Sequence, residues 1–480
     1  MITSLILLLI MSINTYQRPV TTIDSNLEIK FHIKSNEPIL ITNNGNFSVY
    51  ASAGDGNKTN PWIIENYIIN ASGKGAHGIH IEGTTDYFIL RNCSIIEGNI
   101  TCHGIYIRNV VNGRIINNSI RLCTDGIHIS YSSNINLTDN TANNNSRGIY
   151  LEYSDHNTLL NNTAQYETSH GIYLYQSDNN TLIFNKVFDS FYYGVTLESS
   201  HHNNLTQNSV NHNKRYGIYL KSADYNTLTF NEANDNYLFS DGITLSSSDY
   251  NEIINNTLNH NDAHGICLQS FSKYNKMINN TLIDNSDFGF YIESSTNNTL
   301  AHNYAIDNQR GIALYASSHY NELVGNVINN NYYGIYLSQS NSNNISNNFI
   351  NYNGLEGMYL WSSSYNTIIN NTINYNVEDG ICLSSSSHNE IKNNTINENN
   401  YGIFLMSSSY NHILWNKLYY NKECWFESSG CINNTFENND CIARVGAIPG
   451  FIWVYTLLGL SIINVLLFKR NYKRQLSYLN

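Results

Sequence analysis

The stretch GIYLEYSDHNTLLNN, from Gly148 to Asn162, is followed by a near copy of itself, GIYLYQSDNNTLIFN, from Gly171 to Asn185. Each copy holds short alternations of apolar and polar residues, separated by Ser, Asp and Asn clusters that favour turns. The apolar runs are too short for helices, and their spacing is too regular for a hairpin sandwich. Self-similarity at a fixed period of this length indicates a solenoid in which each copy forms one coil.

The Gly that opens the phrase recurs fifteen times at steps of 22 to 26 residues. It stands at Gly78, Gly104, Gly126, Gly148, Gly171, Gly194, Gly217, Gly242, Gly265, Gly289, Gly311, Gly334, Gly357, Gly380 and Gly402. In a parallel β-helix the inward residues of one coil stack on the same residues of the next, and backbone hydrogen bonds run between coils. We therefore predict an all-β, single-stranded, right-handed parallel β-helix of about fifteen coils.

An Asn follows each of these Gly residues at a nearly fixed distance. A residue present in every coil cannot mark one catalytic point, whereas Asn tolerates the left-handed backbone of a tight corner and can stack its amides along a rod. We assign this row to structure. It includes Asn92, Asn118, Asn140, Asn162, Asn185, Asn208, Asn231, Asn256, Asn371 and Asn394.

The composition argues against a nucleic-acid partner. The chain has 480 residues, with 25 Lys and Arg against 37 Asp and Glu, and therefore a formal net charge of −12. Four of the basic residues lie together close to the C-terminus. The rest of the chain is more acidic still, which disfavours binding to a phosphate backbone.

Both ends of the chain carry apolar segments. Residues 1–15 hold an apolar run typical of a secretory signal peptide. Residues 447–468 contain no charged residue and are long enough, at about 1.5 Å per residue, to cross a hydrocarbon layer of roughly 30 Å. The basic tail at 469–480 predicts a cytoplasmic C-terminus. We expect a single-pass protein of the cell membrane with its repeats outside.

This organisation divides the chain into six parts. Between the signal and the membrane helix we expect an N-terminal cap at 16–53, the β-helix at 54–421, and a Cys-containing cap and stalk at 422–446. Cys424, Cys431 and Cys441 are the best candidates for a disulfide at the end of the repeats, because disulfides form in extracellular proteins.

The segment that opens the repeats, GDGNKTNPWIIENYIINASGKGAHGIHIEGTTDYFILRNCSII from Gly54 to Ile96, together with the coils up to Asn421, resembles a known group. These are extracellular right-handed parallel β-helix repeat proteins, with the domain shared by NosD-type periplasmic copper-maturation proteins and by carbohydrate-binding or sugar-hydrolysing surface proteins. The resemblance implies a pectate-lyase-like solenoid. It implies no single function, because the group contains binders, enzymes and proteins of unassigned role.

The residue between the Ile and Leu of GIYL is expected to point to solvent. This row holds Tyr106, Tyr150, Tyr173, Tyr219, Tyr291, Tyr336 and Tyr359. Flat rings with hydroxyl groups at coil spacing suit stacking against the sugars of an extended polysaccharide. Alternatively, Tyr stands here only because it favours strands and covers the sheet. Our leading hypothesis is a surface protein that binds a carbohydrate or another cell-envelope component.

The residue before each repeat Gly forms a second variable row. On four successive coils it reads His103, Asp125, Arg147 and His170. A polysaccharide lyase or uronate epimerase needs a base to remove a proton and a cation to stabilise the resulting enolate. His103 or His170 could be the base and Arg147 the neutralising cation, with Asp125 orienting a His. The alternative is a corner position that accepts any large side chain.

Metal binding is the third hypothesis. The first coils concentrate possible copper ligands, among them His77, His80, Cys102, Cys123 and His128, although Cys102 and Cys123 could instead form a disulfide. A column of acidic residues, Asp155, Asp178, Asp224 and Asp249, could hold calcium or remain solvated. The sequence thus leaves copper and calcium open as cofactors and requires neither.

Overall fold

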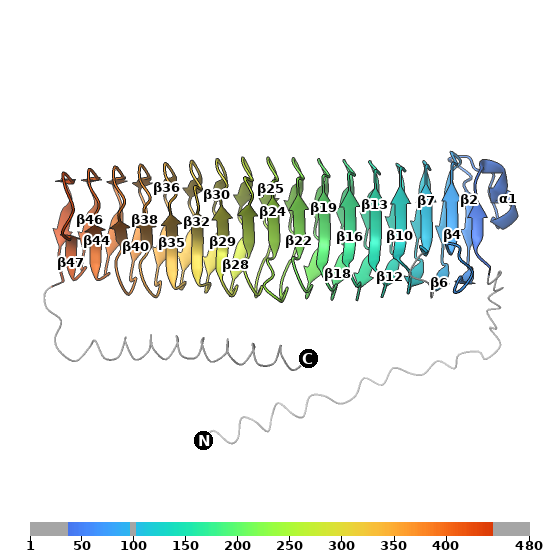
Figure 1. Cartoon of the computed structure of the whole chain (residues 1–480), viewed down its shortest axis with the longest axis horizontal. Helices are drawn as coiled ribbons and strands as arrows, with labels where there is room; N and C mark the ends of the chain where they lie inside the picture. The colour runs from blue at the N-terminus through green and yellow to red at the C-terminus, as the bar shows by residue number, and fades with distance from the viewer. Residues whose placement is uncertain (1–36, 97–101, 445–480) are drawn as a thin grey trace, which may run out of the picture.

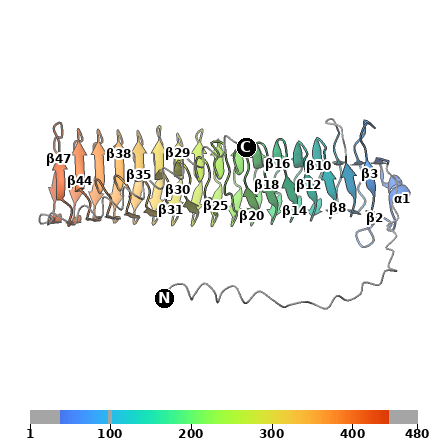
Figure 2. The same cartoon turned by 90° about the horizontal axis from the view of Figure 1, so that it is seen from below.

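The computed structural model describes residues 37–96 and 102–444, which form one long rod (Figure 1). The chain winds into coils of three short strands, and each strand pairs in parallel with strands of the neighbouring coils. Three sheets therefore run along the rod, and Figure 2 shows the same stacking after a quarter turn. The predicted parallel β-helix is confirmed.

The first sheet carries the GIYL phrase and has 17 strands. They are β1 (Ile39–Ile41), β4 (Ile79–Glu82), β7 (Ile105–Arg108), β10 (Asp125–Ser130), β13 (Arg147–Glu152), β16 (His170–Tyr175), β19 (Tyr193–Glu198), β22 (Ile218–Lys221), β24 (Ile243–Ser246), β26 (Ile266–Gln269), β29 (Phe288–Glu293), β32 (Arg310–Tyr315), β35 (Tyr333–Ser338), β38 (Met358–Trp361), β41 (Ile381–Ser384), β44 (Tyr401–Met406) and β47 (Glu423–Glu427). The outermost strands, β1 and β47, extend the sheet beyond the fifteen coils counted from the Gly row. By register, Pro38 and Cys424 stand there in the Gly position.

The second sheet contains the strands that follow the first corner. They are β2 (Trp62–Glu65), β5 (Phe88–Arg91), β8 (Gly113–Ile116), β11 (Asn136–Thr138), β14 (Thr158–Leu160), β17 (Thr181–Ile183), β20 (Asn204–Thr206), β23 (Thr227–Thr229), β25 (Glu252–Ile254), β27 (Lys276–Ile278), β30 (Thr299–Ala301), β33 (Glu322–Val324), β36 (Asn344–Ser346), β39 (Thr367–Ile369), β42 (Glu390–Lys392), β45 (His412–Leu414) and β48 (Thr435–Glu437).

The third sheet is divided into two blocks. The first block holds β3 (Ile68–Asn70), β6 (Ser94–Ile96), β9 (Ser119–Arg121), β12 (Thr141–Asn143), β15 (Thr163–Gln165), β18 (Lys186–Phe188) and β21 (Ser209–Asn211). The second holds β28 (Thr281–Ile283), β31 (Tyr304–Ile306), β34 (Val327–Asn329), β37 (Phe349–Asn351), β40 (Thr372–Asn374), β43 (Thr395–Asn397), β46 (Lys417–Tyr419) and β49 (Asp440–Ile442). Between the blocks, single-residue bridges at Glu232 and Thr257 keep neighbouring coils connected.

Inward side chains form a hydrophobic core along the rod. In the coil of the opening phrase, Ile149, Leu151 and Leu159 are 0% exposed. Each such aliphatic side chain contributes about 1.5–3 kcal/mol when fully buried. The repeat Gly is required by close approach, since a Cβ at Gly148 would lie 2.5 Å from the carbonyl oxygen of Gly171. At the N-terminal end, η1 (Asn44–Asn46) and α1 (Phe47–Tyr50) bring the buried Phe47 over this core.

The predicted Asn row forms a buried ladder of side-chain amides. Asn162 Nδ2 donates to Leu137 O at 3.0 Å and to Asn185 Oδ1 at 3.0 Å, and Asn162 N donates to the same Asn185 oxygen at 3.0 Å. Buried amides cost little when all their hydrogen bonds are made. The same pattern recurs at Asn118, Asn140, Asn185, Asn208, Asn231, Asn256, Asn371 and Asn394.

The left-handed backbone belongs to the residue before the ladder, not to the ladder Asn itself. Asn161 has a φ of 52°, and its following neighbour Asn162 makes the amide contacts. The first coil shows the distinction, because there Asn92 has the positive φ of 54° and Cys93 N donates to Asn118 Oδ1. Our expectation that Asn92 is a ladder member is therefore wrong by one residue.

Several expectations for the ends of the chain fall outside the described residues. These are the signal at 1–15, most of the cap at 16–53, the membrane helix at 447–468 and the tail at 469–480. Within residues 37–96 and 102–444, the structure contains no apolar helix of membrane-spanning length. In the predicted Cys-containing cap, Cys424 and Cys441 form a disulfide, while Cys431 packs against the end of the core.

Candidate functional site

A group of ionisable side chains gathers on the first sheet near the N-terminal end of the rod. We call it the histidine cluster, and it consists of His77, His80, His103, Asp125, His128 and Arg147. Its members come from four successive coils, those of β4, β7, β10 and β13. The parallel register of β10 and β13 places Asp125 beside Arg147, so side chains far apart in sequence meet on one surface.

Asp125 is the charged centre of the histidine cluster. Its carboxylate is 0% exposed and accepts hydrogen bonds from Arg147 Nε at 2.5 Å and Arg147 Nη2 at 3.0 Å. His103 Nδ1 lies 2.8 Å from Asp125 Oδ2. Burial acts to raise the pKa of Asp125, but the contacts with His103 and Arg147 hold that pKa below its ordinary value. Asp125 is therefore ionised at neutral pH.

His128 lies between three potential acceptors. Its Nδ1 is 3.3 Å from His103 Nε2 and 3.3 Å from Asp125 Oδ2. Its Nε2 is 3.4 Å from Glu152 Oε2, is buried, and has no hydrogen-bond partner within the described part of the chain. Burial lowers the pKa of His128 to about 3. The imidazole is therefore neutral at pH 7 and carries a single N–H.

The neutral His128 ring has only one N–H for its two nitrogens, although a carboxylate lies close to each of them. If His128 is protonated at Nδ1, the lone pair of Nε2 faces the Glu152 carboxylate; if it is protonated at Nε2, the lone pair of Nδ1 faces Asp125. Unopposed acceptors in a buried site are costly. Uptake of one cation, either a proton on the His103–His128 pair or a metal ion, removes the conflict.

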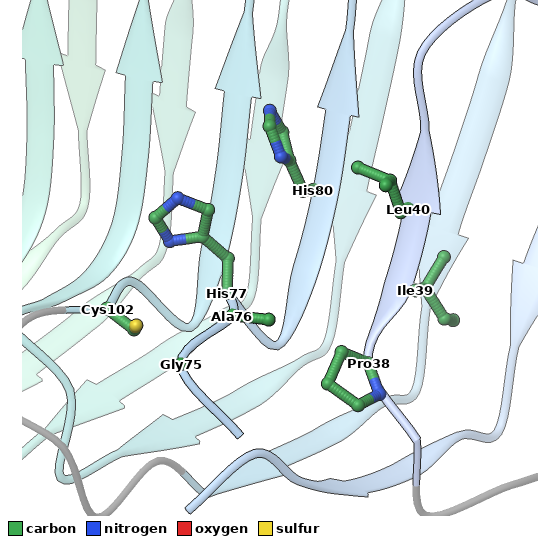
Figure 3. Close-up of a pocket in the computed structure, with 8 residues that line it drawn as sticks. All are labelled: Pro38, Ile39, Leu40, Gly75, Ala76, His77, His80 and Cys102. Carbon is green, nitrogen blue, oxygen red and sulfur yellow. The ribbon is translucent and has the colours of Figure 1, made fainter. Parts of the chain in front are cut away.

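The cluster opens to solvent on its N-terminal side. The ring of His77 stacks on that of His103, with centroids 4.8 Å apart, and burial lowers the pKa of His77 to about 4. A pocket of about 420 Å³ lies beside it between β1 and β4, as Figure 3 shows. Its lining includes Pro38, Leu40, His77, His80 and Cys102. A small ligand could therefore approach the histidine cluster from this end.

The predicted catalytic row is brought together only in part. His103, Asp125 and Arg147 are in contact, whereas His170 Nδ1 is 2.7 Å from Ser169 Oγ and its ring stacks on Tyr173. The Arg147 guanidinium pairs with Asp125 and lies 3.8 Å from the centroid of Tyr150. It would have to leave Asp125 before it could stabilise a substrate enolate.

The predicted tyrosine row lies along the first sheet, but it is less exposed than expected. Tyr150 is only 6% exposed, and the other six are half-buried. Their rings pack against neighbouring rings along the rod, as Tyr150 does on Tyr173 at 5.1 Å and 14°. Ring contacts of this kind cover part of the row, which therefore presents less aromatic surface to a ligand than expected. The row comprises Tyr106, Tyr150, Tyr173, Tyr219, Tyr291, Tyr336 and Tyr359.

A more exposed aromatic stack was missed by sequence reasoning. Tyr225, Tyr250 and Tyr274 are 50%, 44% and 46% exposed, and successive rings lie 4.9 Å apart. Each has a positive φ and stands at the turn before the second sheet. Their regular spacing in the sequence was the available signal. They offer a second aromatic surface, separate from the histidine cluster.

The predicted acidic column has a structural explanation. Asp155 Oδ1 accepts a hydrogen bond from Asp178 N at 2.7 Å, and Asp224 Oδ1 accepts one from Asp249 N at 2.7 Å. Asp178 and Asp249 repeat the contact with the next coils. Each carboxylate thus holds a backbone N–H of its neighbour, which accounts for the column without calcium.

Sequence reasoning also missed a second cluster of possible metal ligands. Its members belong to the row before the repeat Gly and to the row between the Ile and Leu of GIYL. Glu356, Asp379 and Cys382 occupy the same three repeat positions as His103, Asp125 and His128. In each trio, one donor atom from every residue lies within 4.8 Å of the others. Superimposing the two variable rows, rather than reading each alone, would have identified both trios.

Comparison with known proteins places this fold. The sequence matches the profile of a family described as "Periplasmic copper-binding protein (NosD)" over residues 58–236 and 315–445, well over half of the chain. It also matches a profile described as "Right handed beta helix region" over residues 193–350, which agrees with the predicted handedness. No curated protein matches the sequence.

Solved structures match this chain at low sequence identity. The Dettilon tailspike protein is 14% identical over 54% of this chain and 59% of its own, with a TM-score of 0.44. The A-module of the Azotobacter vinelandii mannuronan C-5 epimerase AlgE6 is 11% identical over 86% of this chain and 98% of its own, with a TM-score of 0.36. The periplasmic alginate epimerase AlgG is 10% identical over 84% of each chain, with a TM-score of 0.31.

Proposed function

The chain belongs to the family described as periplasmic copper-binding protein (NosD), and from this premise we propose that its histidine cluster binds a copper ion. The observation that carries the proposal is the buried, neutral His128, which has a lone pair facing acceptor atoms whichever nitrogen is protonated. A metal ion is the cation that removes this conflict at neutral pH.

The donor set fits copper chemistry. Imidazole nitrogen and carboxylate oxygen are ligands of Cu²⁺, which binds such sites more tightly than the other divalent ions of the first transition row. His103, Asp125 and His128 would hold the ion, since their donor atoms lie within 4.8 Å of one another. Arg147 would act on the far side of Asp125, where it fixes the carboxylate and offsets its charge.

Copper titration of the purified full chain tests this proposal. We expect Cu²⁺ to bind, with nitrogen couplings from imidazole in the electron paramagnetic resonance spectrum. His128→Gln should weaken binding at least tenfold. His264→Gln is the matched control, because His264 is also stacked on rings of the first sheet but lies outside the cluster. Absence of binding, or equal binding by both variants, would refute the proposal.

Binding of an extended carbohydrate is the second candidate. It is favoured by the tyrosine row, whose hydroxyl edges follow the first sheet from Tyr106 to Tyr359. Polysaccharide binding by the full chain should fall when Tyr150, Tyr173 and Tyr219 are all replaced with Ala. The matched control replaces Tyr225, Tyr250 and Tyr274, at the turn before the second sheet, with Ala. A loss confined to this control would transfer the binding surface to the exposed stack.

We further propose that the rod lies outside the cytoplasm and is anchored by residues 447–468. The family description and the Cys424–Cys441 disulfide support the compartment, because disulfides persist in oxidising surroundings. The uncharged sequence of 447–468 supports the anchor. Cell fractionation should find the full chain in the membrane and a chain truncated at residue 446 in the soluble fraction. Equal distribution of the two would contradict the anchor.

A further inference from the structure

The trio of Glu356, Asp379 and Cys382 lies near the C-terminal end of the first sheet. Glu356 and Asp379 precede the Gly residues of successive coils, and Cys382 is in β41, three residues after Asp379. This is the geometry of His103, Asp125 and His128, repeated with different ligands. The two trios lie about eleven coils apart, or roughly 50 Å at about 4.8 Å per coil.

The carboxylates of this trio lack a counter-charge among the residues that the structure describes. Neither Glu356 nor Asp379 forms an ion pair with any residue between 37 and 96 or between 102 and 444. Asp379 Oδ1 accepts a hydrogen bond from Tyr401 N at 3.1 Å. The Glu356 Oε2 atom is buried and has no hydrogen-bond partner in the part of the chain that the structure describes.

The thiol of Cys382 points into the same space. Its side chain is 3% exposed, and the structure gives it no disulfide and no hydrogen bond among the described residues. Its sulfur lies within 4.8 Å of an oxygen from each carboxylate. Two acidic groups and a thiol that face each other without a cation form an incomplete electrostatic arrangement.

The equivalent carboxylate in the middle of the rod is satisfied by its own neighbours. Asp241 accepts a hydrogen bond from Thr244 Oγ1 at 2.6 Å and another from His264 N at 3.1 Å. A buried carboxylate at this corner therefore does not need a ligand as such. The C-terminal trio differs because it adds a second carboxylate, Glu356, and a thiol, Cys382. Among the described residues, no hydrogen-bond donor is directed at Glu356 Oε2 or at the Cys382 sulfur.

We propose that Glu356, Asp379 and Cys382 form a second metal site, which takes a divalent ion that accepts thiolate, with Zn²⁺ as the best fit. Zn²⁺ binds Cys sulfur together with carboxylate oxygen, and three protein ligands leave one coordination position open for water or a substrate group. On binding, the S–H bond of Cys382 breaks, a sulfur–metal bond forms, and the proton passes to solvent. The harder nitrogen and oxygen donors of the histidine cluster make the two sites chemically distinct.

Cobalt substitution tests this site independently of copper binding. The purified, reduced full chain is titrated with Co²⁺ alone, which takes Zn²⁺ sites and gives a thiolate-to-cobalt charge-transfer band. We expect the band to appear with one equivalent, and to disappear when Zn²⁺ is added. Cys382→Ser should abolish it, and Glu356→Gln should weaken Co²⁺ binding at least tenfold. Cys267→Ser, at the same repeat position beside Asp241, should leave the band unchanged.

Two controls separate loss of metal binding from loss of the fold. Unfolding in the presence of a chelator should show that Glu356→Gln is no less stable than the parent chain, because it removes an unpaired buried charge. Proton release on Zn²⁺ addition should be smaller in Cys382→Ser than in the parent chain. A parent chain that shows no thiolate band, or a Cys382→Ser variant that keeps it, overturns the proposal.

Discussion

The two ends of the first sheet use the same three backbone positions for opposite electrostatic purposes. Near the N-terminus Asp125 is paired with Arg147, and its pKa is lowered. Near the C-terminus Asp379 faces Glu356 with no ion-pair partner in the described part of the chain, and burial raises its pKa. The backbone of a β-helix therefore fixes where side chains meet, while the residue on the next coil decides whether a buried carboxylate is stable as an anion.

Removal of the counter-charge should have the largest effect. Arg147→Met leaves Asp125 buried without the two hydrogen bonds of its guanidinium partner, and we expect a loss of about 3–5 kcal/mol in the free energy of unfolding. Arg310→Met is the matched control, because Arg310 occupies the same repeat position but packs on aromatic rings and forms no ion pair within residues 37–96 and 102–444. Chemical denaturation at pH 7 measures both. Equal losses would show that Arg147 contributes packing alone.

The next largest effect on stability is expected at Glu167, a buried carboxyl group at a position where other coils have an Asn. Glu167 accepts a hydrogen bond from Asn145 N at 2.6 Å, and burial raises its pKa to about 8. Because the folded pKa lies above the unfolded value, the contribution of Glu167 to stability is most favourable below about pH 4.5 and is lost as the pH rises to about 8. Glu167→Gln should remove this pH dependence and stabilise the chain at pH 9 by about 2–4 kcal/mol.

Unfolding curves between pH 5 and pH 9 test this second prediction. The informative quantity is the difference between the variant and the parent chain at each pH, since other groups titrate in both. A difference that stays constant with pH would mean that Glu167 is ionised in the folded chain throughout.

Matched amide substitutions at the two ends should have opposite signs. In metal-free protein at pH 8, Asp125→Asn should destabilise by about 2 kcal/mol because it loses a charge-assisted pair. Asp379→Asn should stabilise by about 1–2 kcal/mol, because Asp379 must ionise as the pH rises through about 7 and the amide does not. Thermal or chemical unfolding in a chelator gives both values. The same sign for both variants would break the comparison between the ends.

The smallest effect separates hydrogen bonding from ring packing. Tyr173 Oη donates to Glu198 Oε2 at 2.6 Å, so Tyr173→Phe should cost about 1 kcal/mol. Tyr336, at the equivalent position, makes no hydrogen bond through its hydroxyl among the described residues, and Tyr336→Phe should change stability little. Similar costs for the two variants would indicate that the hydroxyl groups do not contribute.

Much of the fold was predictable because the same pattern of residues recurs in every interior coil. Gly148, Ile149, Leu151 and Asn162 recur in coil after coil, so the parallel register follows from the period. The ends were less accessible, since β1 and β47 lack the repeat Gly and were not counted. These terminal coils also have inward apolar side chains, as the others do, but they lack the Gly by which the coils were counted.

The site was predictable in position but not in contacts. The rows containing His103, Asp125 and Arg147 were identified, yet Arg147 was expected to face a substrate and instead pairs with Asp125. Tyr150 was expected in solvent and is buried by the rings around it. Side-chain direction depends on neighbours from other coils, which a single row does not contain. The trio at Cys382 was missed for the same reason.

The amide ladder also determines how such a molecule can change in length. Asn162 bonds to Leu137 in one coil and Asn185 in the next, so every interior coil presents the same donors and acceptors to both sides. Gain or loss of one whole coil between β16 and β35 would recreate these contacts and shift the two trios apart or together by about 4.8 Å. Duplication of a single repeat could therefore adjust the spacing of two sites while leaving the chemistry of each intact.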